Sequence, residues 1–244
     1  MQNKNEKPAK GAAFGSVADN AAVGDGINEF IQKHREQLFV SAGVILLVLV
    51  LCIVALSVMD MLRVRAISAV EEFGSRYETL SPSITEEYSA NDAAELIAEI
   101  EAFTKKTTTM TSGYAEGKAW SIIGSIHSDK KDWPAAETAW AKAAEAGKKT
   151  YLAAPAFFNA AVSAEEQGKT EKAIEYYTNC IASSAEFSAA PRAQFAIGRL
   201  RETLRENEAA IEAYRAVISG WAYDKVWTNL AHSRIIALEE ETGR

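Results

Sequence analysis

The feature that most constrains the fold of this chain is a spacing of 37 residues that recurs in its C-terminal half. Small residues recur at this spacing in two columns, and aromatic residues recur in a third. The columns are Gly124, Ala161 and Gly198; Ala136, Ala173 and Ala210; and Trp140, Tyr177 and Tyr214. A period of about 20 to 50 residues is typical of proteins built from stacked supersecondary units.

The residue types in these columns predict a helical hairpin in each unit. A small residue on the first helix lets the second helix approach closely, and the alanine on the second helix does the same in return. The aromatic residue, four positions after that alanine, lies on the same helical face and fills the space between hairpins. A single hairpin cannot bury its apolar face, so stacking of the units makes the core. We therefore predict an all-α solenoid.

The pattern resembles that of the tetratricopeptide repeat (TPR) family. The family pattern opens with a large residue, continues with a large–small pair, and has a small residue followed by an aromatic residue in the second helix. The large opening position is filled by Trp120 and Phe157. The third unit departs from the pattern with Gln194, although Phe195 can serve instead. The period exceeds the usual repeat of about 34 residues, and it is similar to the longer repeats of envelope-assembly TPR proteins such as BamD and CpoB.

The boundaries of the solenoid follow from proline, glycine and capping signals. Pro155 and Pro191 predict the starts of first helices, and Gly168 predicts the turn of the second hairpin. Thr170 and Asn207 are predicted to cap second helices. The predicted repeats are 117–153, 154–190 and 191–223, followed by a capping helix over 224–241.

Partial units flank these repeats. An apolar stripe from Leu96 to Phe103, with the stretch 61–80 as its partner, predicts one more hairpin, separated from the repeats by a polar loop over 107–113. The repeat domain over 61–244 is thus predicted to hold about four hairpins and a cap. The cap should have a polar outer face, as the end of a solenoid requires.

An apolar segment precedes the repeats. Leu38 to Met59 are 22 residues without a charge, which as a helix span about 33 Å, enough to cross a hydrocarbon core of about 30 Å. We predict a transmembrane helix over 38–60 and a flexible tail over 1–37. A cleaved signal peptide is one alternative, which the long tail and the long apolar run disfavour. A lipoprotein signal ending at Cys52 is another, disfavoured because Cys52 lies inside the apolar run and follows the bulky Leu51. Basic residues on the two flanks are nearly balanced, so charge does not choose the orientation.

This layout resembles the YfgM-type ancillary subunit of the bacterial Sec translocon. The resemblance implies a single-pass protein of the inner (cytoplasmic) membrane, with a cytoplasmic N-terminus and a periplasmic, extracytoplasmic C-terminal domain. It also implies an adaptor near the protein secretion machinery, with the Sec translocon, chaperones or envelope proteins as partners. The alternative, suggested by the long period, is a structural component of an envelope assembly or division complex of the BamD or CpoB kind.

The sequence offers little for other functions. The net charge is −7 without a run of basic residues, which argues against nucleic-acid binding. The three histidines are isolated, and no phosphate loop or nucleophile elbow occurs. Cys180 takes the place of a small packing residue in the second repeat. We therefore predict no catalytic residue, metal, cofactor or small-molecule substrate, and a protein-binding scaffold instead of an enzyme.

The resemblance also implies where a partner would bind, because TPR solenoids present their first helices on a concave face. The family's concave positions fall on Lys118, Ser121 and Ser125; on Phe158, Val162 and Glu165; and on Arg192, Phe195, Arg199 and Glu202. Such a groove would hold two aromatic rings flanked by charges, without the dense Lys/Arg clamp of chaperone-type TPR domains. The alternative is that both phenylalanines pack between neighbouring helices.

Overall fold

The computed structural model describes residues 29–84, 90–106 and 113–241. Most of the predicted tail and of the predicted polar loop therefore lies outside the described residues. The chain divides into two compact units, Met1–Val58 and Met59–Arg244. Within the described ranges all regular structure is helical, in agreement with the predicted all-α class.

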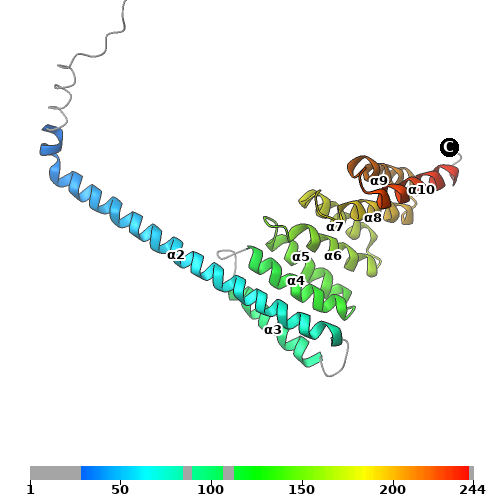
Figure 1. Ribbon diagram of the computed structural model, residues 1–244, viewed down its shortest axis with the longest axis horizontal. Coiled ribbons are helices and arrows are strands. Elements are labelled where there is room, and N and C mark those ends of the chain that lie inside the picture. The colour runs from blue at the N-terminus through cyan, green and yellow to red at the C-terminus, as the bar shows by residue number, and fades with distance from the viewer. Residues whose placement is uncertain (1–28, 85–89, 107–112, 242–244) are drawn as a thin grey trace, which may run out of the picture. The chain divides into compact units, whose positions relative to one another are not determined.

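The apolar segment lies in α2, Arg35–Leu80 (Figure 1). This helix is long and apolar enough to cross a membrane, and none of its most apolar window is buried within the protein. Phe39 and Leu46, for example, are 69% and 64% exposed. Helical structure begins within the last part of the predicted flexible tail, since residues 29–33 are already helical and the Leu38 amide donates to the His34 carbonyl oxygen at 2.9 Å.

The repeat unit consists of consecutive helices that pack chiefly on their neighbours along the chain (Figure 1). A short 3-10 helix, Ser81–Ser83, ends α2. The α-helices that follow are α3 Ala90–Lys106, α4 Gly113–Asp129, α5 Trp133–Ala146, α6 Ala153–Glu166, α7 Thr170–Ser183, α8 Ala190–Thr203, α9 Asn207–Gly220 and α10 Lys225–Glu241. The pairs α4–α5, α6–α7 and α8–α9 are the hairpins of the three sequence repeats.

A further hairpin precedes them, as predicted. The C-terminal part of α2 packs on α3, where Val70, Leu96 and Ile100 are fully buried in one cluster. Phe73 and Phe103 meet edge to face, with 5.6 Å between ring centroids. The described part of the repeat unit thus holds four hairpins followed by α10.

The repeat columns line the core. Each aromatic residue in the third column is buried, and two of them lie directly against the glycine of the first column. The approach is so close that a Cβ atom added at Gly124 would lie 2.7 Å from the Trp140 ring, and one at Gly198 would lie 2.5 Å from the Tyr214 ring. Trp120 and Phe157 are half-buried at the edge. The buried members are Gly124, Ala136, Trp140, Ala161, Ala173, Tyr177, Gly198, Ala210 and Tyr214.

The three hairpin turns share one backbone conformation. Lys131, Gly168 and Arg205, again 37 residues apart, have φ of 56°, 72° and 61°. In each turn the next residue's amide reaches back to a carbonyl oxygen near the end of the first helix, as in the bond from Asp132 to His127 at 2.8 Å. This is a Schellman motif, whose left-handed residue is usually glycine. Two of the three turns therefore place a long basic side chain where glycine is preferred.

We expect opposite effects from exchanging residues at these turns. Gly168→Ala should lower the free energy of unfolding by about 1 kcal/mol, because a Cβ has room there but the left-handed backbone disfavours it. Arg205→Gly should raise the free energy of unfolding by about 0.5 kcal/mol. Glycine removes the cost of the left-handed backbone, and this gain exceeds the stability lost because glycine makes the unfolded chain more flexible. Gly220→Ala, at a glycine with open space and no positive φ, is the control and should not destabilise. Urea denaturation checks all three; a loss in Arg205→Gly would contradict the explanation.

The predicted N-caps of the second helices are wrong by one residue. Thr170 and Asn207 are the first helical residues, and the caps are Lys169 and Glu206, which make no side-chain capping bond. The Schellman turn leads directly into the second helix, so the turn geometry decides where it begins. Asp132 does cap α5, where its carboxylate accepts from the Ala135 amide at 3.4 Å.

The outer face of the terminal helix is less polar than predicted, because three apolar side chains are exposed among the polar ones. Val226, Leu230 and Ile236 of α10 are 66%, 44% and 57% exposed. Trp227, Leu230 and Ala231 repeat the opening pattern of a first helix, and in complete units the residues that match Leu230 are buried or half-buried. Among the described residues no second helix follows α10, so the face that would pack on one is exposed.

Candidate partner-binding groove

The structure brings together the predicted groove residues of α6 and α8. A shallow hollow of about 270 Å³ lies between them and α10. Trp227 of α10, together with Glu166, Tyr177 and Ala196, completes the lining and was missed from sequence. The predicted residues that line the hollow are Val162, Glu165, Arg192, Phe195 and Arg199.

The remaining predicted residues lie elsewhere. Lys118, Ser121 and Ser125 are half-buried on α4 and do not line this hollow. The Ser121 hydroxyl donates to the Gly117 carbonyl oxygen on its own helix at 2.8 Å. Glu202 is engaged by neighbouring helices, as described below. The groove is therefore confined to the last two hairpins and α10.

The two predicted aromatic residues have different environments. Phe158 is only 8% exposed and packs edge-on against Tyr177 and Phe187, with ring centroids 5.4 and 6.1 Å away. The Arg192 guanidinium covers its ring at 5.1 Å. Phe195 is half-buried, lies 5.0 Å from the Tyr214 ring, and faces the groove beside Trp227 at 5.4 Å. Phe158 is thus mainly a core residue, whereas Phe195 offers an aromatic surface.

One hydrogen bond recurs inside each hairpin. The Tyr177 hydroxyl donates to Glu165 at 2.7 Å, and the Tyr214 hydroxyl donates to Glu202. In the first repeat Trp140 Nε1 donates to the Ser128 hydroxyl at 3.0 Å. The three acceptors are also 37 residues apart, so the period extends to the polar partners of the buried rings.

Ion pairs connect successive first helices along the groove. Arg199 of α8 donates to Glu165 of α6, and Arg234 of α10 donates to both oxygens of Glu202 of α8. We call these four residues the first-helix ladder. Both carboxylates are mostly buried, with side chains 18% and 17% exposed. Each carboxylate receives a tyrosine from its own hairpin and an arginine from the next, so the ladder fixes the stacking of neighbouring units.

The ladder perturbs the pKa of Glu202 and of Tyr214, the tyrosine that donates to it. Burial by itself raises the pKa of Glu202, but hydrogen bonds from Arg234 and Tyr214 outweigh it and hold the pKa below its ordinary value. Burial and the Glu202 carboxylate raise the pKa of Tyr214, so its hydroxyl keeps the proton that it donates.

Cys180, outside the ladder, is a buried packing residue. Burial alone raises the pKa of its thiol to about 12, so the thiol stays protonated and unreactive.

These shifts predict an acid-sensitive ladder. A carboxyl with a lowered folded pKa contributes stability that is present above its unfolded value of about 4.5 and is lost as the pH falls through the folded pKa. The free energy of unfolding of the parent chain should decrease between about pH 6 and pH 3.5. In Glu202→Gln this decrease should be smaller by at least about 0.5 kcal/mol. Urea titrations at the two pH values measure the difference. Glu212→Gln, which removes an exposed carboxyl outside the ladder, should keep the parent's full drop.

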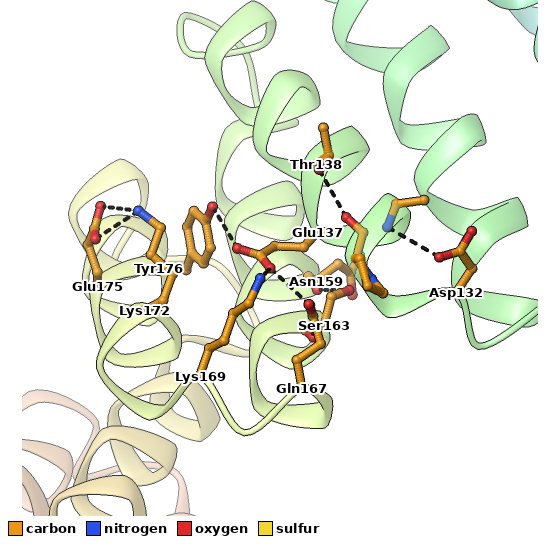
Figure 2. Close-up of polar contacts among 12 residues, drawn as sticks. Asp132, Glu137, Thr138, Asn159, Ser163, Gln167, Lys169, Lys172, Glu175 and Tyr176 are labelled. Atoms are coloured by element: carbon orange, nitrogen blue, oxygen red, sulfur yellow. Dashed lines mark hydrogen bonds and ion pairs between the residues drawn. The ribbon is translucent and has the colours of Figure 1, made fainter.

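A second polar cluster joins the first two repeats on the side of the second helices (Figure 2). Glu137 of α5 is 9% exposed. It accepts hydrogen bonds from Lys169 at 2.7 Å, from Gln167 at 2.9 Å and from the Tyr176 hydroxyl at 3.3 Å. Burial raises the pKa of Glu137, but these partners outweigh it and the net pKa is lowered. All the donors come from the second hairpin, so the cluster bridges two units.

Sequence reasoning missed Glu137, although a signal existed. The residues 37 and 74 positions later are Ile174 and Ile211, both 7% exposed. A glutamate in a column of buried isoleucines predicts a polar interaction specific to that unit. The partner residues lie about 30 to 40 positions away and could be identified only after folding.

Comparisons with known proteins agree with the repeat architecture. Models of the tetratricopeptide repeat match residues 155–185 and 191–219. A TPR repeat-containing protein of Treponema pallidum (strain Nichols) is 30% identical over 229 residues, which cover 89% of this chain and 95% of that protein. A crystal structure of nearly identical TPR-like repeats from Podosopora anserina superposes with a TM-score of 0.51 at 11% identity, over 71% of this chain and 88% of that one. That structure supports the fold alone.

TPR repeats generally mediate binding to other proteins and are usually not enzymatic. The repeat columns, the two matched segments and the full-length similarity lead to the same assignment. This chain belongs to the tetratricopeptide repeat family.

Proposed function

We propose that this chain is a membrane-anchored scaffold that binds a segment of another protein in the groove of α6, α8 and α10. The observation that carries the anchor is α2, in which an exposed apolar helix continues without a break into the first hairpin of the repeats. In water the exposed side chains of 38–59 would be strongly unfavourable, whereas a bilayer would cover them. The anchor would hold the repeats at the membrane surface.

The lining of the groove suggests what kind of segment it binds. Phe195, Trp227 and Val162 provide apolar surface. Glu165 and Arg199 neutralise each other, which leaves the exposed Arg192 and the exposed Glu166 as one cation and one anion of the lining. A segment that presents an apolar side chain next to a carboxylate would fit, for example one face of a helix. This chemistry differs from a site for a free C-terminal carboxylate, which would need more basic residues.

A site-specific photocrosslinker tests the groove in cells. Placed at Phe195, it should give a cross-link to a discrete protein, and Arg192→Glu in the same chain should weaken that cross-link several-fold. The matched control carries the crosslinker at Glu212, an exposed position of α9 outside the groove. Equal yields from both positions, or no cross-link from Phe195, would contradict the proposed site.

The location is the second part of the proposal. The layout similar to YfgM-type proteins favours a cytoplasmic N-terminus and a repeat domain on the extracytoplasmic side of the bacterial inner membrane, near the Sec machinery. A reporter enzyme fused after Arg244 should be active only outside the cytoplasm; activity inside would refute this orientation. The identity of the cross-linked protein then separates the two candidate functions. Translocon subunits or chaperones favour the adaptor, and outer-membrane assembly or division proteins favour the envelope component suggested by the 37-residue period.

A further inference from the structure

A larger hollow, of about 810 Å³, lies within the repeat unit where α2, α4 and α5 meet. Its lining includes Arg63 of α2, the first turns of α4, the end of α5 and the turn that follows. It shares no lining residue with the partner-binding groove. It is therefore a separate surface of the molecule.

The lining of this hollow is basic in a chain that is acidic overall. Four cationic side chains, Arg63, Lys142, Lys148 and Lys149, face two carboxylates, Glu116 and Glu145. Lys148 forms an ion pair with Glu145, so these two charges cancel in the net charge of the lining. The Lys142 ammonium lies 4.0 Å from the centroid of the Trp120 ring, in a cation–π contact. The remaining cations outnumber the remaining carboxylate, so the hollow favours an anion.

Aromatic side chains surround these cations. Tyr114 and Trp120 belong to the lining, and Tyr151, which is 73% exposed, lies 5.9 Å from the Tyr114 ring. Tyrosine and tryptophan are the residue types enriched where a membrane meets water. A cluster of basic and aromatic residues is therefore typical of a surface in contact with lipid headgroups.

The short chain path from the apolar segment limits how far Arg63 can lie from a bilayer. Arg63 lies four residues after Met59, the last residue of the uncharged run. At about 1.5 Å per residue a helix rises about 6 Å over that distance, and the polar layer extends roughly 5 to 8 Å beyond the hydrocarbon core. With 38–59 in a bilayer, Arg63, which lines the hollow, would therefore lie close to the lipid phosphates.

We propose that this hollow binds the phosphate headgroup of an anionic lipid in the adjoining leaflet. The inference rests on the proposed function in one respect, since it requires α2 to be a membrane anchor. Lys142 and Lys149 would contact the phosphate together with Arg63, and Trp120 and Tyr151 would lie among the headgroups. Bound lipid would hold the first repeat against the bilayer and limit the orientations of the groove relative to the membrane.

The test uses the full chain reconstituted in nanodiscs of phosphatidylcholine with increasing fractions of phosphatidylglycerol. Hydrogen exchange of amides in residues 142–151 should slow as the anionic fraction rises, and the effect should saturate. Each basic residue near an anionic surface is worth about a 5-fold change in affinity. Lys142→Gln with Lys149→Gln should therefore raise the half-saturating anionic fraction at least about 5-fold. The control, Lys130→Gln with Lys225→Gln, removes the same charge outside the hollow and should match the parent chain.

Several results would overturn the proposal. One is equal weakening in both double variants, which would indicate general surface charge. Another is protection in neutral nanodiscs on adding millimolar glycerol phosphate to the same extent as with anionic lipid, which would indicate a soluble phosphate ligand. A chain that integrates into nanodiscs but shows no dependence on anionic lipid refutes the headgroup site and leaves the anchor intact. A chain that fails to integrate refutes the anchor and the headgroup site together. Circular dichroism of each variant shows whether its helices are retained.

Discussion

Replacing Tyr214 with alanine is expected to lower the free energy of unfolding by about 3–5 kcal/mol, the usual loss for a large buried ring. Its side chain is fully buried and fills the space between α8 and α9. Gly198 approaches the ring so closely that not even a methyl group fits between them. The cavity left by the substitution cannot close without shifting one helix of the hairpin.

Two further variants divide this loss into its parts. Tyr214→Phe keeps the ring and removes the bond to Glu202, which retains Arg234, so it should cost about 1–2 kcal/mol. Tyr223→Ala removes a ring that is 77% exposed and should change stability by less than about 0.5 kcal/mol. If Tyr214→Ala cost no more than Tyr223→Ala, the third column would not be a core column.

The measurement should resolve individual repeats. Solenoid stability is approximately a sum of repeat and interface contributions, so one repeat can open before its neighbours. Urea denaturation gives the overall loss, and hydrogen exchange should locate it in α8, α9 and α10. Phe195 lies 5.0 Å from the Tyr214 ring, so we also expect Tyr214→Ala to disturb the groove wall.

Glu137 provides the second large effect, and the size of that effect depends on the replacement. Glu137→Ala should lower the free energy of unfolding by about 1–3 kcal/mol, because it creates a cavity and leaves the Tyr176 hydroxyl without its acceptor. The loss falls below that for a fully buried ion pair because the Lys169 side chain is 49% exposed and can be hydrated. Glu137→Ile should be within about 1 kcal/mol of the parent chain, since apolar replacement of a buried pair is often neutral.

The repeat itself supports this contrast. Ile174 and Ile211 occupy the matching positions of the next two hairpins and are buried there. Glu175→Ala, which breaks the exposed pair with Lys172, is the control for loss of a surface charge and should cost less than about 0.5 kcal/mol. Urea denaturation of the three variants measures these differences in the free energy of unfolding. An isoleucine variant as unstable as the alanine variant would mean that this interface cannot accept an apolar residue.

Parts of the groove could be predicted from sequence because TPR first helices have fixed inward positions. Val162, Glu165, Arg192, Phe195 and Arg199 were found in this way, and they line one hollow. Trp227 was missed because the terminal helix was interpreted only as a cap. Phe158 occupies a concave position in the pattern, yet Phe187 and Arg192 cover it. Phe187 lies in the connection between α7 and α8, whose course no repeat column describes, and it brings Phe158 and the first turn of α8 together.

The ion pairs of the first-helix ladder could not be predicted from the repeat period either. Its carboxylates are 37 residues apart, but Arg199 and Arg234 are 35 apart and form no column. Arg199 follows the small residue of its own helix, Gly198, by one position, whereas Arg234 follows Ala231 by three, so the two arginines occupy different helical positions. A long arginine side chain can still reach the preceding carboxylate despite this offset. The pairing is therefore visible only when the helices are placed side by side.

The amino-acid sequence by itself determined the helical class, the 37-residue hairpin unit and the apolar segment before it. These properties follow from local rules, since close helix contacts need small residues and a long uncharged helix needs an apolar environment. Only the tertiary structure decided which polar groups meet, as Glu165 does with Arg199 and Glu137 with Lys169. It also placed Arg63 in the lining of one hollow with the lysines after α5. Long charged side chains tolerate wide variation in spacing, so their partners are selected by how the hairpins stack.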